Sequence, residues 1–197
     1  MKKIKIGILI SGRGSNFRAI HEATKNSDFP AEIAIVISNK KDAAGLDYAK
    51  ENQIHTAFLD HKLFNNREDF DKELTKILKD ANCELICLAG FMRILSVDFI
   101  NHWKDKIINI HPSLLPSFKG GNAVEDAINH GVKYSGCTVH YVIEEVDSGK
   151  IIDQTAVEVL ENDTKETLAN RILEKEHILY PRALKKACEL INNSGLD

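Results

Sequence analysis

Short apolar, β-branched runs alternate with amphipathic helical segments through the first 110 residues of the chain. The runs are typical of strands and lie at 4–10, 32–37, 55–59, 84–90 and 106–110. Helical periodicity is found at 15–26, 42–52 and 67–81. Strands that alternate with helices are typical of a parallel sheet covered by helices on both faces. The sequence therefore predicts an α/β fold with a mostly parallel central sheet.

The pattern changes after residue 131. Segments 135–143 and 150–159 are typical of strands, and the turn-like sequence EEVDSG separates them, so we expect a hairpin-like pair added to the sheet. A long helix over about 164–192 follows, and Pro181 predicts a break in it because proline lacks the N–H of the helical ladder. The segment 112–131 is expected to form a mobile loop. No repeat or linker divides the chain, so residues 1–197 are predicted to form one domain.

Composition excludes several classes of protein. The net charge is −3, and lysine and arginine are spread along the chain rather than gathered in a stripe, so no nucleic-acid partner is expected. The longest uninterrupted apolar run, LICLAGFM at 85–92, is too short to cross a bilayer, so no membrane association is expected. The four cysteines form no Cys-x-x-Cys pair, which favours a reduced, cytoplasmic location.

A glycine-rich turn, ISGRGSNF at 10–17, joins the first strand to the first helix. Open backbone N–H groups and the helix dipole make such a junction an anion site, and Ser15 and Asn16 add side-chain donors. Phe17 stands where a dinucleotide fingerprint requires a third glycine, and the second strand ends without an acid. The motif favours a phosphate monoester over a dinucleotide. The alternative is a plain tight turn capped by Ser15.

Two polar residues, Asn109 and His111, occur at the end of the apolar run KIINI. Residues two apart in a strand point to the same side, and ligands of open α/β sheets bind at the carboxyl ends of the strands. An asparagine amide can donate to a developing oxyanion, and a histidine can act as a general acid. The alternative is a structural pair in which Asn109 satisfies the backbone of the following loop.

Asp147 lies in the turn between the two late strands. If this turn reaches the same edge of the sheet, its carboxylate would stabilise the charged form of His111 or position a proton-carrying water. An ordinary Asp-Ser-Gly turn is the alternative. In principle His111, His140 and Asp147 could converge on a metal ion, but the sequence has no His-x-x-x-His or His-Glu-x-x-His spacing, so no metal site is predicted.

Four motifs occur in a characteristic order, namely SGRGSN near the start, LAGFMRIL at 88–95, NIHPSLLP at 109–116 and VDSG at 146–149. With them the sequence resembles the phosphoribosylglycinamide formyltransferases, folate-dependent enzymes of purine synthesis, over essentially its whole length. NIHPSLLP with a distal aspartate is typical of folate-dependent formyltransferases in general, and GSN after the first strand indicates the glycinamide ribonucleotide branch. The resemblance implies a Rossmann-like formyltransferase fold and formyl transfer from 10-formyltetrahydrofolate to glycinamide ribonucleotide, without a metal.

The resemblance also assigns roles to residues of this sequence. Catalysis would rest on Asn109, His111 and Asp147. The substrate phosphate would be held by Gly14, Ser15 and Asn16, and the rest of the ribonucleotide by Arg67 and Glu176. The folate pocket would be lined by Met92, Arg93, Ile94, Leu95, Asn109, Ile143, Glu144, Glu145, Val146 and Asp147. The two small-molecule substrates would be the partners of a cytoplasmic monomer or weak homodimer.

The sequence departs from the family at a few positions. Asn122 stands where some relatives carry a histidine, so the resemblance gives it no catalytic role. Lys150 replaces a frequent proline in the turn after Asp147, and Leu173 and Lys175 differ from some relatives near Glu176.

Three other functions remain as alternatives. A formyltetrahydrofolate deformylase would use the same three residues with water as the acceptor, but usually carries an extra N-terminal domain. A methionyl-tRNA formyltransferase would carry a C-terminal domain and a basic surface. A chain that starts at the first strand, ends at residue 197 and has net charge −3 favours neither. A non-catalytic module that binds a phosphorylated metabolite would need the glycine-rich turn, but not Asn109, His111 and Asp147 together.

Overall fold

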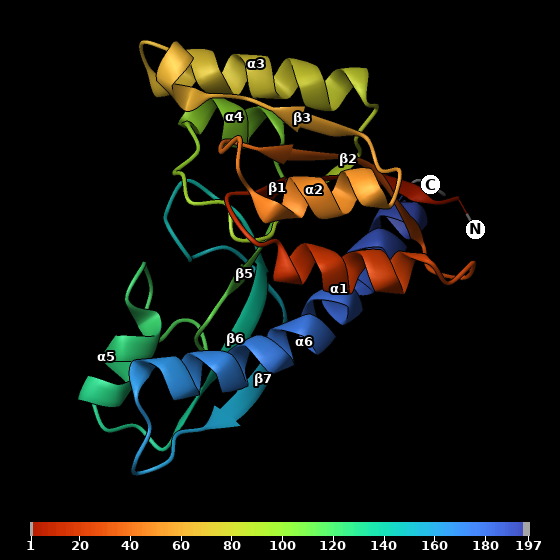
Figure 1. The fold of residues 1–197 in the computed structure, drawn as a ribbon. Coiled ribbons are helices and arrows are strands. Elements are labelled where there is room, and N and C mark those ends of the chain that lie inside the picture. Colours follow the sequence, from red (N-terminus) through yellow and green to blue (C-terminus); the bar gives the residue numbers. More distant parts are fainter. Residues whose placement is uncertain (1, 195–197) are drawn as a thin grey trace.

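Within residues 2–194, which the computed structural model describes, seven strands form one sheet in the order β3-β2-β1-β4-β5-β6-β7 (Figure 1). The parallel strands are β1 (Ile4–Ile10), β2 (Ala31–Ser38), β3 (Thr56–Phe58), β4 (Leu85–Leu88) and β5 (Ile107–His111). The antiparallel strands are β6 (Tyr134–Tyr141) and β7 (Ile151–Glu158). The predicted mostly parallel sheet with a late hairpin-like pair is confirmed.

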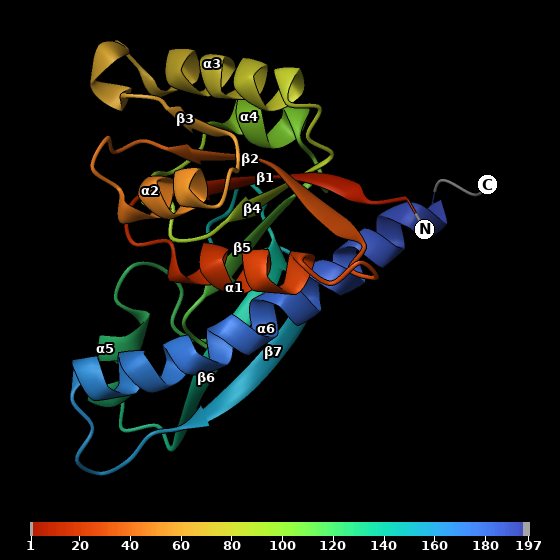
Figure 2. The same cartoon turned by 45° about the vertical axis from the view of Figure 1, so that its right-hand side comes forward.

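Helices cover both faces of the sheet and enclose two hydrophobic cores. One core takes buried side chains from α1 (Ser15–Thr24), α2 (Ala44–Glu51), α5 (Ala123–Asn129) and α6 (Lys165–Ser194). The other core takes them from α3 (Arg67–Asp80), which follows the short 3-10 helix η1 (His61–Leu63), and from α4 (Val97–His102). Figure 2 shows α1 lying beside α6 on the first face, in agreement with the contacts between them.

The apolar runs form the central strands because both of their faces are buried. In β1, Ile6 and Ile8 point into the first core and Leu9 into the second, as the alternation of side chains along a strand requires. Gly7 lets α3 approach the sheet, since a Cβ atom there would lie 2.4 Å from Cδ2 of Leu78. From Ile6 to Ile10 the strand is apolar at every position rather than alternating, because both of its faces are covered.

The predicted break at Pro181 is wrong, because α6 continues from Lys165 to Ser194 with the proline inside it. Proline removes one N–H donor from the ladder. The neighbouring side chains of Tyr180, Ala183 and Leu184 are fully buried in the first core. Packing on both sides of the proline holds the two halves of the helix in place.

The segment 112–131 is not a loop throughout, because α5 occupies Ala123–Asn129. Neither α5 nor α4 was expected from the sequence. Each makes at most two turns, 7 and 6 residues long, so too few apolar positions repeat for a helical period to be visible.

The carboxyl ends of three central strands meet at one edge of the sheet. Leu9 of β1 pairs with Leu88 of β4, and Leu88 pairs with Asn109 of β5. The three segments that follow these strands therefore start side by side, which is the position where open α/β sheets bind ligands. No helix between residues 2 and 194 is long and apolar enough to cross a membrane.

Candidate active site

Strand β5 places Asn109 and His111 on the same side of the sheet, as their spacing predicts. His111 is buried, with 5% of its surface exposed, and Asn109 is half-buried. The antiparallel register sets Asn109 opposite His140 of β6. A second histidine therefore joins the pair that the sequence indicated.

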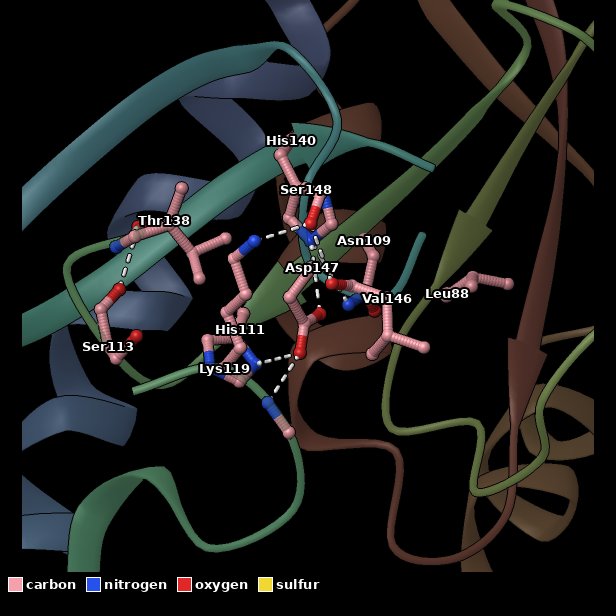
Figure 3. A network of polar contacts seen from close by, with 12 residues as sticks. Leu88, Asn109, His111, Ser113, Lys119, Thr138, His140, Val146, Asp147 and Ser148 are labelled. Atoms are coloured by element: carbon pink, nitrogen blue, oxygen red, sulfur yellow. Dashed lines mark hydrogen bonds and ion pairs between the residues drawn. The ribbon is translucent and has the colours of Figure 1, made fainter. Parts of the chain in front are cut away.

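Asp147 reaches this pair from the turn between β6 and β7 (Figure 3). Its Oδ2 atom lies 3.3 Å from Nδ1 of His111 and accepts a hydrogen bond of 2.8 Å from the backbone N–H of Gly120. The backbone of Asp147 has φ of 52°, in the left-handed region that aspartate tolerates better than most residues. The turn thus holds the carboxylate against His111.

The ring of His111 faces an oxygen at each nitrogen. Nε2 lies 2.8 Å from the carbonyl oxygen of Phe118, and Nδ1 faces the carboxylate of Asp147. Neither oxygen can donate, so Nε2 carries the proton of the hydrogen bond to Phe118, and a second proton on Nδ1 would make the contact with Asp147 an ion pair. The site therefore sets a ring that can carry a proton beside Asn109.

His140 completes the network, and no role was predicted for it. Its Nδ1 lies 2.9 Å from the carbonyl oxygen of Tyr141, and its Nε2 lies 3.5 Å from both Nδ2 of Asn109 and Oδ1 of Asp147. A neutral ring accepts from the Asn109 amide, whereas an imidazolium donates to Asp147. In the sequence, a histidine inside a β run cannot be told from one packed in the core.

Opposing effects act on the carboxyl group of Asp147. Burial alone would raise its pKa, but the hydrogen bond from His140, the Gly120 N–H and the nearby His111 ring together lower that pKa below its usual range. Asp147 is therefore a carboxylate at neutral pH. It can accept or relay a proton at the edge of the sheet.

A pocket opens beside Asn109 and Asp147. It brings together eight of the ten residues that the resemblance assigned to folate, namely Arg93, Ile94, Leu95, Asn109, Ile143, Glu144, Val146 and Asp147. Its lining also includes Leu88, Phe91, Ile100, His140 and Val142. The other two residues that the resemblance assigned to folate, Met92 and Glu145, do not line the pocket. The side chain of Met92 is exposed, and Glu145 pairs with Lys119 at 3.1 Å. The aliphatic lining residues Leu88, Ile100 and Val142 were not predicted, because in the sequence they look like ordinary core residues.

A second polar site lies at the junction of β1 and α1. Gly14 takes φ of 68°, and α1 begins at Ser15. The buried Asn16 donates a hydrogen bond of 2.7 Å from Nδ2 to Oε2 of Glu176 on α6. Oδ1 of Asn16 has no hydrogen-bond partner in the part of the chain that the structure describes. Burial raises the pKa of Glu176, and the hydrogen bond from Asn16 opposes that rise.

Four of the five residues assigned to the ribonucleotide, Gly14, Ser15, Asn16 and Glu176, lie together at this junction. The fifth, Arg67, lies on the other face of the sheet. Arg67 is exposed at the start of α3, whose buried side chains belong to the second core. Its charge, with that of Arg93, acts on the buried Asp71.

His111, His140 and Asp147 do converge, as a hydrogen-bonded network. Among residues 2–194, no group of three or more histidine, cysteine, aspartate or glutamate side chains is arranged to hold a metal ion.

Residues 4–184 match the family model described as Formyl transferase. The chain belongs to the formyl transferase family. The phosphoribosylglycinamide formyltransferase of Haemophilus influenzae is 44% identical to this chain, over 92% of this chain and 85% of that protein. The glycinamide ribonucleotide transformylase 1 of Symbiobacterium toebii has a crystal structure that superimposes with a TM-score of 0.92 and 43% identity, covering 95% of this chain and 88% of that one.

Longer relatives also match this chain. The human trifunctional purine biosynthetic protein adenosine-3 is 50% identical over 93% of this chain. The chain spans 18% of the length of that relative.

Proposed function

We propose that the chain transfers the formyl group of 10-formyltetrahydrofolate to the glycinamide amine of 5'-phosphoribosylglycinamide. The products are the N-formyl ribonucleotide and tetrahydrofolate, and the reaction is a step of de novo purine synthesis. The observation that carries the proposal is the meeting of Asn109, His111 and Asp147 beside a pocket at the carboxyl edge of the sheet. The names of the relatives support the identity of both substrates.

The reaction exchanges one C–N bond for another. The substrate amine attacks the formyl carbon, and the carbonyl oxygen becomes negatively charged. The Asn109 amide donates a hydrogen bond to this oxygen, and the Nε2–H of His111 donates a second one after it leaves the carbonyl oxygen of Phe118, which lowers the energy of the tetrahedral intermediate. The bond from carbon to the folate nitrogen then breaks, and the amine proton passes through Asp147 or a bound water to that nitrogen. No covalent bond to the enzyme is formed.

The two substrates would bind at two different places, one in the pocket and the other at the β1–α1 junction. Folate would bind in the pocket lined by residues such as Arg93, Ile94 and Val146, with its formyl group toward Asn109. The ribonucleotide phosphate would bind at Gly14, Ser15 and Asn16, where helix α1 begins. Glu176 would contact the same ribonucleotide. Arg67 would contact the ribonucleotide from outside the β1–α1 junction. The exposed Met92 and Glu145 would contact folate from outside the pocket lining.

The first experiment follows turnover of 10-formyltetrahydrofolate by absorbance, with and without glycinamide ribonucleotide. Turnover that requires both substrates supports the transformylase. Equal turnover without the ribonucleotide would make water the acceptor, and the function would be that of a deformylase. No turnover in either case would favour the non-catalytic binding module. Calorimetry would then measure its affinity for the ribonucleotide directly.

We further propose that the protein works in the cytoplasm as a monomer or weak homodimer, with only its small-molecule substrates as partners. The four buried free cysteines are consistent with a reducing compartment. The net charge of −3 gives no electrostatic attraction to nucleic acid or to an anionic membrane. Sedimentation at several protein concentrations tests the assembly state.

A further inference from the structure

A buried tyrosine contacts the backbone of the residue before Asn109 and that of its partner in the neighbouring strand. Tyr180 of α6 is fully buried, and its hydroxyl lies 3.0 Å from the carbonyl oxygen of Leu88 and 3.2 Å from that of Ile108. Ile108 precedes Asn109 in β5, and Leu88 is the β4 residue paired with Asn109. The hydroxyl thus connects the last paired residue of β4 to the residue of β5 that precedes Asn109, near the edge that carries the site.

We propose that Tyr180 is a positioning residue that fixes the backbone of Asn109, and this inference rests on the proposed function. A single phenol hydrogen is shared between two carbonyl oxygens, so the donor restrains the separation of β4 and β5 where their pairing ends. The Asn109 side chain leaves the backbone directly beyond this restraint. Tyr180 acts through the main chain and touches neither substrate.

On its β4 side, β5 has no ladder partner beyond Asn109, although β6 pairs with it as far as His111. The register between β4 and β5 stops at Leu88 and Asn109, and the chain after Leu88 lines the pocket through Phe91 and Arg93. Strand ends fray more easily than strand centres, since fewer ladder hydrogen bonds hold them. An oxyanion donor must be fixed to a fraction of an ångström to be effective.

The same helix face also carries the second polar site. Glu176 lies four residues before Tyr180 on α6, which places both side chains on one face of the helix, and Glu176 accepts the hydrogen bond from Asn16. Helix α6 therefore fixes the β1–α1 junction and the end of β5 at once. Tyr180 is the contact of this face that reaches the strand carrying Asn109 and His111.

The test removes the hydroxyl and keeps the ring. We expect Tyr180→Phe to lower kcat by about tenfold, with KM for both substrates changed less than twofold, because the oxyanion donor shifts while the pockets keep their lining. In the double variant with Asn109→Ala, the loss should equal that of Asn109→Ala alone, because Tyr180 acts through Asn109. Tyr134→Phe, which removes the hydroxyl of an exposed tyrosine in β6, is the matched control and should retain full kcat.

A readout independent of turnover separates this proposal from the proposed function. In ¹⁵N-labelled protein without ligand, the backbone amide signals of Asn109 and Ile110 should move in Tyr180→Phe and stay in place in Tyr134→Phe. Unmoved signals, an unchanged kcat, or losses that multiply in the double variant would each overturn the positioning role. If the wild-type protein turns over no ribonucleotide, the proposed function fails, and the amide signals still test the restraint on β5.

Discussion

Nδ1 of His111 lies 3.3 Å from Oδ2 of Asp147, and each side chain is less than one-tenth exposed. One residue ends a strand of the sheet, and the other sits in the turn of the antiparallel pair added to it. The contact therefore depends on the junction between the parallel and antiparallel parts of the fold. It also gives His111 the carboxylate partner that the proposed chemistry requires.

Replacement of His111 by alanine should abolish turnover and leave ribonucleotide binding intact. In the proposed mechanism the His111 ring donates to the developing oxyanion, whereas the phosphate would bind at the β1–α1 junction. We expect kcat to fall by about 100- to 10,000-fold. Steady-state kinetics and calorimetric titration with the ribonucleotide measure the two effects. Activity that survives the change would contradict the mechanism.

Asp147→Asn should separate the charge of this residue from its shape. The amide oxygen can still accept from the Gly120 N–H, but His111 loses a negatively charged partner. We expect kcat to fall about 100-fold, with KM for folate changed only a few-fold. Asp98→Asn, on α4, is a control for the loss of one carboxylate. Equal kinetics of Asp147→Asn and wild type would remove Asp147 from the catalytic group.

Gly14→Ala should weaken ribonucleotide binding and destabilise the fold. An alanine there must adopt φ of 68°, and its Cβ would lie 3.3 Å from Cα of Gly45. We expect a loss of about 1–2 kcal/mol in the free energy of unfolding, together with a higher KM for the ribonucleotide. Gly12→Ala is the control for stability, because a Cβ at Gly12 meets no atom within 4 Å. Equal stabilities of the two variants would show that the strain at Gly14 is absent.

Glu176→Gln should change how stability depends on pH. Burial raises the pKa of Glu176, so the folded protein holds this proton more tightly than the unfolded chain, in which a glutamate titrates near 4.3. The contribution to stability is present below about pH 4.3 and is lost as pH rises through the raised pKa. The variant lacks this loss, and its amide oxygen still accepts from Asn16. Urea unfolding between pH 4 and 8 compares the two slopes, and identical slopes would contradict the assignment.

The central strands were predictable because their side chains must be buried on both faces. The run at 4–10 coincides with β1, in which Ile6 and Ile8 enter one core and Leu9 enters the other. The behaviour of Pro181 was not predictable, because tertiary packing of Tyr180 and Leu184 outweighs the lost hydrogen bond. Short helices such as α4 leave too weak a periodic signal.

The convergence of Asn109, His111 and Asp147 was predictable in part. Strand spacing places the first two together, whereas the approach of Asp147 depends on how β6 pairs with β5, which no local pattern contains. The contributions of His140 and Tyr180 are invisible in the sequence for the same reason. Each looks like an interior residue until the register of the strands is known.

Asn16 and Glu176 are separated by 160 positions in the chain and meet only where α6 lies against the start of α1. A partly folded molecule with an intact sheet but a detached C-terminal helix lacks the carboxylate of this polar pair and so, under the proposed function, one side of the ribonucleotide site. Activity regained on dilution from denaturant would then report the docking of that helix rather than the collapse of the sheet.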